Sequence, residues 1–183
     1  MRVNTGLAKG RKLKSLPGDA IRPITDRAKQ AICNILMDDV RDSRWLDLFA
    51  GTGAVGVEAL SRGAAEVTFI DVLPEAIRLI RENLRTTGLQ ARARVIRQDA
   101  FDYLAGRPSV HYDFIFVAPP QYKGLWSRAV TAIDEQIGWL AEAGTVIVQL
   151  DPREYAPLTL DHLMLSDQRR YGKTMLLFYD RCS

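Results

Sequence analysis

The chain has few of the residues from which disulfide frameworks, zinc sites and thiol or imidazole nucleophiles are built. Its 183 residues include two cysteines, Cys33 and Cys182, and two histidines, His111 and His162, none of them close together in sequence. Structural zinc sites and disulfide-rich domains depend on repeated, closely spaced cysteines and histidines. We therefore expect no metal and no disulfide, with Cys33 serving as a packing residue.

Long apolar runs are also missing. No stretch reaches the length of about 18 apolar residues that a membrane-spanning helix needs. The basic N-terminus lacks the apolar core and small-residue cleavage site of a secretory signal. We therefore expect a cytoplasmic protein that does not contact a membrane. With 47% apolar residues, the chain can form one globular domain around its own core, and we expect a monomer.

Positive charge is concentrated near the start of the chain, although the formal net charge is only +3. In the first thirty positions two acidic residues stand against a larger basic set: Arg2, Lys9, Arg11, Lys12, Lys14, Arg22, Arg27 and Lys29. This excess suits a polyanionic partner, while a solvated tail is the other interpretation. Recurring apolar residues and glycines leave an ordered hairpin open. We divide the chain into an arm or hairpin at residues 1–24 and a main domain at residues 25–183.

Strands and helices alternate along the main domain. Apolar runs predict strands at residues 45–49, 67–70, 93–97, 114–117 and 145–150, and helical periodicity predicts helices at residues 25–37, 54–62, 74–87 and 125–140. This alternation predicts a parallel sheet covered by helices on both faces. Residues 158–165 and 175–179 also read as strands, but too few residues separate them for a crossover helix. They should form an antiparallel hairpin at one edge of a seven-stranded sheet.

A glycine-rich loop follows the first strand. Gly51, Gly53 and Gly56 have the GxGxxG spacing that places a nucleotide at the start of a helix. The first two glycines allow the backbone to approach a ligand, and the third allows the helix to pack closely on the sheet. Asp71, at the end of the next strand, can accept both hydroxyls of a ribose. These residues alone suit either NAD or S-adenosylmethionine.

Two further carboxylates help to choose between these cofactors. Asp47 ends the first strand, where it would repel a pyrophosphate but suit the cationic methionine portion of S-adenosylmethionine. Asp99 follows the third strand, where it or the adjoining backbone can meet an adenine amino group. Open α/β sheets bind ligands at the carboxyl ends of their strands, where all three carboxylates should meet. An NAD-dependent oxidoreductase is the weaker alternative, because it leaves Asp47 unexplained and the chain has no obvious substrate domain.

Five stretches of the sequence are typical of one protein family: Gly10-Arg11-Lys12-Leu13, Arg22-Pro23-Ile24-Thr25-Asp26-Arg27, Leu46-Asp47-Leu48-Phe49-Ala50-Gly51-Thr52-Gly53, Glu58-Ala59-Leu60-Ser61-Arg62-Gly63-Ala64 and Arg170-Tyr171-Gly172-Lys173-Thr174. In these stretches the sequence resembles class I methyltransferases, and more narrowly the RsmD-like family that methylates guanine N2 in 16S ribosomal RNA. The resemblance implies a Rossmann-like fold and a substrate within a small-subunit particle. It also implies S-adenosylmethionine contacts from Asp47, Phe49, Gly51, Gly53, Asp71, Val72, Asp99 and Ala100. The RNA contacts that we expect are Arg11, Lys12, Arg22, Arg27, Arg170, Tyr171 and Lys173.

One motif departs from the family pattern. Where the family has Asp or Asn, two prolines and an aromatic residue, this chain has Ala118, Pro119, Pro120, Gln121 and Tyr122. In the family, the first side chain and a proline carbonyl accept from the target amine while the ring stacks on the extruded base. We therefore keep two hypotheses. In the first, the chain is an active guanine-N2 methyltransferase in which the Pro119 carbonyl, Gln121 and Tyr122 replace the usual arrangement. In the second, it is a catalytically weak protein that binds cofactor and RNA, and the intact carboxylates favour the first.

Overall fold

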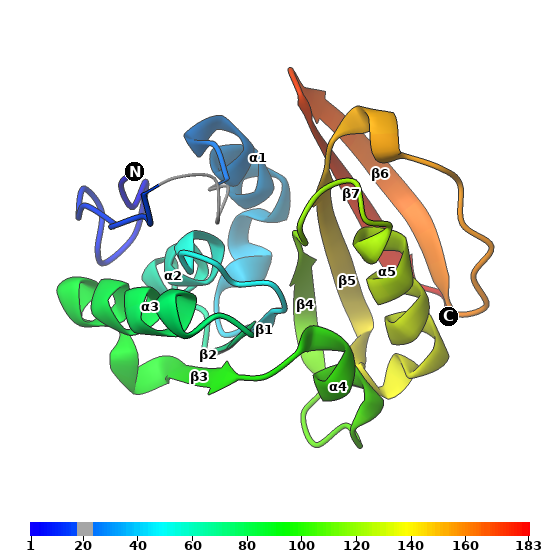
Figure 1. Cartoon of the computed structure of the whole chain (residues 1–183), viewed down its shortest axis with the longest axis horizontal. Helices are drawn as coiled ribbons and strands as arrows, with labels where there is room; N and C mark the ends of the chain where they lie inside the picture. Colours follow the sequence, from blue (N-terminus) through cyan, green and yellow to red (C-terminus); the bar gives the residue numbers. More distant parts are fainter. Residues whose placement is uncertain (18–23) are drawn as a thin grey trace.

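The centre of the molecule is a seven-stranded sheet of order β3-β2-β1-β4-β5-β7-β6 (Figure 1). The computed structural model describes residues 1–17 and 24–183, so Arg22 lies outside the described residues. Neighbouring strands are parallel, except that β7 runs antiparallel to both β5 and β6. The predicted α/β sheet, mostly parallel with a C-terminal antiparallel hairpin, is confirmed. The strands are β1 (Arg44–Asp47), β2 (Glu66–Asp71), β3 (Ala93–Arg97), β4 (Tyr112–Val117), β5 (Leu140–Leu150), β6 (Leu163–Tyr171) and β7 (Thr174–Arg181).

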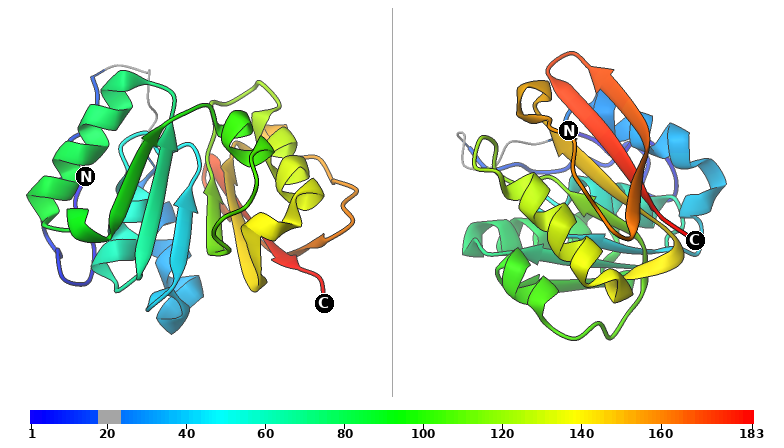
Figure 2. Two further views of the ribbon diagram at one scale, coloured as in Figure 1. Left: turned by 90° about the horizontal axis from the view of Figure 1, so that it is seen from below. Right: turned by 90° about the vertical axis from the view of Figure 1, so that its right-hand side faces the viewer.

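Helices cover both faces of this sheet (Figure 2). Apolar residues of α1, α2 and α3 belong to one core cluster, and those of α4 and α5 belong to a second cluster. The strand order reverses between β1 and β4, which is where an open α/β sheet forms a ligand crevice at its carboxyl edge. The helices are α1 (Asp26–Leu36), α2 (Ala54–Ser61), α3 (Pro74–Thr87), α4 (Ala100–Ala105) and α5 (Leu125–Glu135).

The central strands are apolar at successive positions because helices cover both faces of the sheet. In β4, Phe114 and Phe116 belong to the cluster beneath α1–α3, whereas Ile115 and Val117 belong to the cluster beneath α4 and α5. Successive side chains of a strand point to opposite faces, so both sets are buried. This arrangement explains why the strands could be recognised in the sequence as unbroken apolar runs.

Several predicted boundaries are wrong. The helix expected at residues 125–140 ends at Glu135, and a 3₁₀ turn at Ile137–Trp139 leads into β5 five residues before its predicted start. The strand expected at residues 158–165 begins only at Leu163. The preceding backbone is held instead by the buried Asp134 carboxylate, which accepts hydrogen bonds from the backbone N–H groups of Asp161, His162 and Leu163. Helix α4 was not predicted at all.

The described part of the basic arm is an ordered hairpin packed on the domain. The Val3 N–H donates to the Arg11 carbonyl at 2.9 Å, and the Gly10 N–H donates to the Val3 carbonyl at 2.8 Å. Val3, Ala8 and Leu13 are buried in the same core cluster as α1 and α2. Residues 1–17 therefore form part of the folded unit rather than a solvated tail.

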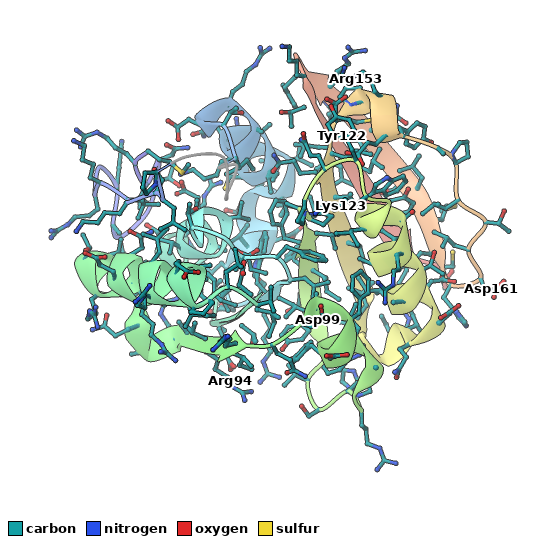
Figure 3. The ribbon with its side chains drawn as sticks, viewed as in Figure 1. Arg94, Asp99, Tyr122, Lys123, Arg153 and Asp161 are labelled. Atoms are coloured by element: carbon teal, nitrogen blue, oxygen red, sulfur yellow. The ribbon has the colours of Figure 1, made fainter. Side chains whose placement is uncertain are left out.

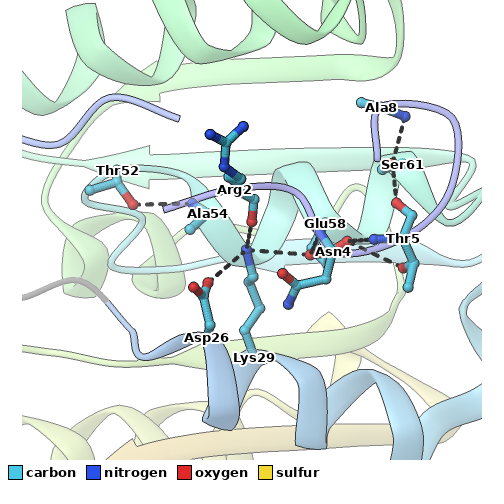
Figure 4. Close-up of polar contacts among 10 residues, drawn as sticks. All are labelled: Arg2, Asn4, Thr5, Ala8, Asp26, Lys29, Thr52, Ala54, Glu58 and Ser61. Carbon is cyan, nitrogen blue, oxygen red and sulfur yellow. Dashed lines mark hydrogen bonds and ion pairs between the residues drawn. The ribbon is translucent and has the colours of Figure 1, made fainter. Parts of the chain in front are cut away.

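A buried ion pair fastens this hairpin to α1 and α2 (Figure 4). Lys29 Nζ lies 3.3 Å from Glu58 Oε1, and each side chain is only 1% exposed. Lys29 also donates to the Arg2 carbonyl at 2.7 Å, while Glu58 accepts from the backbone N–H groups of Asn4 and Thr5 at 2.8 and 3.2 Å. Each charge thus has a counter-ion and backbone partners, as buried charges require.

Candidate active site

A cavity of about 670 Å³ lies at the carboxyl ends of the parallel strands. Its volume is within the usual range of small-molecule sites. Of the eight predicted cofactor residues, seven line it: Asp47, Phe49, Gly51, Asp71, Val72, Asp99 and Ala100. The exception is Gly53, whose φ of 78° forms the left-handed turn into α2. The structure therefore brings together residues that are separated by as many as 53 positions in the chain.

Asp47 has an unsatisfied oxygen in this cavity. Its side chain is 1% exposed, and its Oδ2 accepts a hydrogen bond from the Gly56 N–H at 3.3 Å. Oδ1 is buried without a partner. Burial, with a smaller contribution from the nearby Asp71 charge, raises the pKa of Asp47 to about 8 against the opposing Gly56 hydrogen bond. A cationic donor placed in the cavity would satisfy Oδ1 and stabilise the ionised form.

The glycine loop is shaped by Asp71 and by close packing. Asp71 Oδ2 accepts from the Gly51 N–H at 2.9 Å, and Oδ1 accepts from the Leu73 N–H at the same distance. This carboxylate thus fixes the loop while still lining the cavity. A Cβ atom at Gly56 would lie 2.3 Å from the Phe69 ring, so only glycine permits α2 to pack this closely on β2.

Asp99 caps a helix at the rim of the cavity. Its carboxylate accepts hydrogen bonds from the Phe101 and Asp102 N–H groups at 2.8 and 3.0 Å, and it begins α4 (Figure 3). These bonds satisfy free N–H groups of the first helical turn. The predicted contact between Asp99 or its neighbouring backbone and an adenine amino group stays a prediction.

The segment containing the Pro-Pro motif is divided between the cavity and the surface. Ala118, Pro119, Pro120 and Gln121 line the cavity, but Tyr122 does not. Tyr122 has a positive φ of 62° and its side chain is exposed. Its predicted stacking on a target base would therefore require the ring to move into the cavity.

Tyr122 is held against the 3₁₀ turn after β5, which spans Pro152–Glu154 (Figure 3). Its hydroxyl donates to Asp151 Oδ2 at 2.5 Å and accepts from Arg153 Nη2 at 2.5 Å. Its backbone N–H donates to Glu154 Oε1 at 2.7 Å. The Arg153 hydrogen bond, followed by that of Tyr122, lowers the pKa of Asp151, so this carboxylate remains ionised at neutral pH.

Ten cavity residues were not predicted as site residues: Ile24, Leu48, Ala50, Thr52, Ala54, Val55, Leu73, Gln98, Phe116 and Gln149. Ile24 and Gln98 adjoin motifs that the sequence had singled out, so proximity to those motifs was an available signal. Leu73 follows Val72 at the rim, where both apolar side chains are exposed. Gln149 lies near the end of β5, and no motif in the sequence marks it.

The residues predicted to contact RNA form two separate groups. At one site the Arg27 guanidinium lies 5.4 Å from the centre of the Tyr171 ring, beside the exposed Arg170 and Lys173 of the β6–β7 hairpin. Arg11 and Lys12 lie on the N-terminal hairpin, apart from the tip of the β6–β7 hairpin (Figure 1). The predicted RNA contacts therefore do not form one continuous cluster.

The described residues contain neither a membrane-spanning helix nor a metal-binding group of side chains. No helix in residues 1–17 and 24–183 is long and apolar enough to cross a membrane. Within the same ranges, no group of three or more His, Cys, Asp or Glu side chains is arranged to hold a metal ion.

Relatives and solved structures match the chain over nearly its full length. YlbH of Bacillus subtilis (strain 168) is 36% identical over 183 residues, which cover 99% of each chain. Ribosomal RNA small subunit methyltransferase D of Escherichia coli (strain K12) is 32% identical over 182 residues, which cover 99% of this chain and 90% of the relative. The solved structure of yhhF from Escherichia coli superposes with a TM-score of 0.88 at 31% identity, and the match covers 99% of this chain and 97% of that one.

A more distant structure shares the fold alone. The RNA methyltransferase from Salinibacter ruber in complex with S-adenosyl-L-homocysteine has a TM-score of 0.66 at 15% identity, covering 87% of this chain and 94% of that one.

The family described as conserved hypothetical protein 95 matches residues 1–180. This match and the methyltransferase D relatives confirm the resemblance on which the sequence motifs rest. The chain therefore belongs to the conserved hypothetical protein 95 family, that of the RsmD-like proteins.

Proposed function

We propose that the chain methylates the exocyclic N2 of a guanine in 16S ribosomal RNA, with the small-subunit particle as its substrate. The broader activity is that of an S-adenosylmethionine-dependent ribosomal RNA methyltransferase, in agreement with the names of relatives that match nearly the whole chain. The observation that carries the proposal is the partnerless Oδ1 of Asp47 inside the 670 Å³ cavity. A buried carboxylate oxygen of this kind suits the ammonium group of the cofactor's methionine portion.

The cofactor supplies an electrophilic methyl group on a sulfonium, so the protein has mainly to position the acceptor amine. Asp47 would hold the ammonium group, and Asp71 would face the ribose from the next strand. The Pro119 carbonyl at the cavity wall can accept one N–H of the target amine. This hydrogen bond favours a nitrogen lone pair directed at the methyl group. The amine nitrogen would take the methyl group while the electron pair of the broken C–S bond stays on sulfur, and the proton of the amine would pass to water.

A second candidate is the catalytically weak protein that binds cofactor and RNA. It is favoured by Ala118, which has a methyl group where the family carries an Asp or Asn side chain. Loss of one preorganised polar group typically lowers the rate by about 10²–10³, which slows an enzyme without abolishing it. The lined cavity and the free Asp47 oxygen suit both candidates, because each binds the cofactor, and they argue only against a protein that binds RNA alone.

Methyl transfer to unmodified small-subunit particles separates the candidates. Labelled methyl groups should appear in 16S RNA and map to guanine N2 after digestion to nucleosides. Protein-free 16S RNA serves as the comparison substrate and should react more slowly. Binding of both S-adenosylhomocysteine and the particle without transfer of label would favour the second candidate.

The cluster of Arg27, Arg170 and Lys173 around Tyr171 supports RNA binding beside the cavity. Basic side chains grip phosphates with an affinity that falls as salt rises, and an aromatic ring can stack on a base. Replacing Arg170 and Lys173 with Ala should weaken particle binding and make its logarithmic salt slope shallower by about 2. The same change at Arg11 and Lys12 is the matched comparison for the N-terminal hairpin. We also propose that the protein acts as a monomer, and the ribosomal substrate supports a cytoplasmic location.

A further inference from the structure

The end of β5 lies beside the Pro-Pro motif, on the same face of the sheet. In the β4–β5 pairing, Phe116 is opposite Ile147 and Val117 is opposite Val148, so Ala118 and Gln149 come next on the two chains. Phe116 and Ile147 share the core cluster beneath α1–α3. Because side chains alternate along a strand, Gln149 faces the same side as Ile147, and it lines the cavity together with Ala118.

Gln149 carries an unused hydrogen-bond acceptor. Its amide oxygen Oε1 is buried and has no hydrogen-bond partner. In the described part of the chain, four buried side-chain oxygen or nitrogen atoms lack a partner, and two of them, Asp47 Oδ1 and Gln149 Oε1, belong to residues that line this cavity. Buried polar atoms are nearly always paired, so the cavity should receive a donor for each of them.

The two positions complement each other in size and chemistry. Ala118 has no acceptor and occupies little space, whereas Gln149 on the adjacent strand has a long side chain that ends in an amide. The terminal torsion of glutamine is broad, so a rotation can turn the amide oxygen from its covered position towards the cavity. An amide oxygen accepts from an N–H as an Asn side chain does.

The geometry points to Gln149 as the acceptor that positions the target amine in place of the side chain missing at residue 118. This inference rests on the proposed function. In it, the Pro119 carbonyl holds one N–H of the guanine 2-amino group and Gln149 Oε1 holds the other. The ligand at this part of the cavity is therefore a base with an exocyclic amine, and Gln149 contributes to recognition of that amine as well as to methyl transfer.

The first test measures recognition without methyl transfer. Guanosine and inosine 5′-monophosphates differ only in the 2-amino group, and each is titrated into the protein saturated with S-adenosylhomocysteine. Wild type should bind the guanine nucleotide more tightly, and Gln149→Met should lose that preference while retaining its melting temperature and its affinity for S-adenosylhomocysteine. Gln90→Met, at an exposed glutamine before β3, is the matched control and should keep the preference. Equal binding of the two nucleotides by wild type, or binding of neither, overturns the inference.

The second test measures methyl transfer to the small-subunit particle. Gln149→Met should lower the single-turnover rate about 10²–10³-fold, the effect of removing one preorganised polar group. Adding Ala118→Asp to Gln149→Met should recover at least part of this loss, because it restores an acceptor on the neighbouring strand. An unchanged rate in Gln149→Met would refute the role in transfer. If wild type transfers no methyl group yet shows the nucleotide preference that Gln149→Met loses, the proposed function fails and Gln149 remains the amine acceptor.

Discussion

Cofactor binding should depend steeply on pH because of Asp47. Burial raises the pKa of this carboxyl to about 8, so it is largely protonated at neutral pH before a ligand binds. The methionine portion of the cofactor carries an ammonium group, which favours the ionised form. At pH 7, ionising a carboxyl whose pKa is about 8 costs about 1.4 kcal/mol. Binding should therefore release a proton, and affinity should rise with pH.

The size of the effect follows from the ionised fraction. With a pKa of about 8, affinity for S-adenosylhomocysteine should increase about ninefold from pH 6 to 7 and about fivefold from pH 7 to 8. Calorimetry in buffers with different ionisation enthalpies measures both the affinity and the proton release. Asp47→Asn should bind more weakly at pH 8 and show little dependence over this range.

Two controls isolate the carboxyl–ammonium contact. Methylthioadenosine lacks the amino-acid portion, so its affinity should not show the rise in wild type. Asp99→Asn removes an exposed carboxylate from the same cavity rim and should keep the pH slope. A flat profile for wild type, or the same slope in wild type and Asp47→Asn, would refute the assignment of Asp47.

The stability of the protein without a ligand should change with pH in the opposite direction to cofactor affinity. The folded-state pKa of Asp47 lies above its unfolded value, so the folded state binds more protons between about pH 4 and 8. The contribution of this residue to stability is therefore present at low pH and is lost as pH rises through that window. S-adenosylhomocysteine should reverse this trend by pairing with the ionised carboxylate.

Two further substitutions test the contacts that support the site. Tyr122→Phe removes the hydroxyl that donates to Asp151, so methyl transfer should slow about 3–10-fold while cofactor affinity is kept. Single-turnover kinetics measure this rate. An unchanged rate would mean that this hydrogen bond does not orient the Pro-Pro segment. Lys29→Met leaves the buried Glu58 carboxylate without its counter-ion, so the free energy of unfolding in denaturant should fall by about 3–5 kcal/mol. Lys14→Met breaks an exposed pair and should cost at most about 1 kcal/mol; equal losses in the two Lys variants would contradict the structural role of the buried pair.

The sheet could be predicted because each central strand leaves a pattern of apolar residues within a short stretch of the sequence. Strands β1, β2 and β4 are covered on both faces, so each appears in the sequence as a short apolar run. The start of β6 could not be predicted, because Asp134 on α5 captures the backbone of residues 161–163 from a distance of 27–29 positions. Helix α4 has only six residues, too few for a helical period, and its N-cap Asp99 was the available signal.

The candidate site was likewise predictable only where local sequence determines it. Asp47, Asp71 and Asp99 could be assigned to one place, because the carboxyl ends of parallel strands meet at one edge of a sheet. The outward position of Tyr122 could not be predicted, since it depends on Asp151, Arg153 and Glu154. Those partners follow Tyr122 by about thirty residues, and no spacing rule connects them.

The two unpaired oxygens of the cavity also discriminate between cofactors. A dinucleotide places its pyrophosphate at the glycine loop, where the added negative charge would disfavour ionisation of Asp47 further and would offer no hydrogen-bond donor to Oδ1. S-adenosylmethionine instead brings an ammonium group, which would satisfy Oδ1 and would offset the cost of ionising the carboxyl. Gln149 is an amide and suits a neutral N–H rather than a charge, which fits an amine held on a base. On this proposal the cavity binds an ammonium group at Asp47 and an amine at Gln149, and a methyl donor of this kind together with a nucleobase acceptor would meet both requirements.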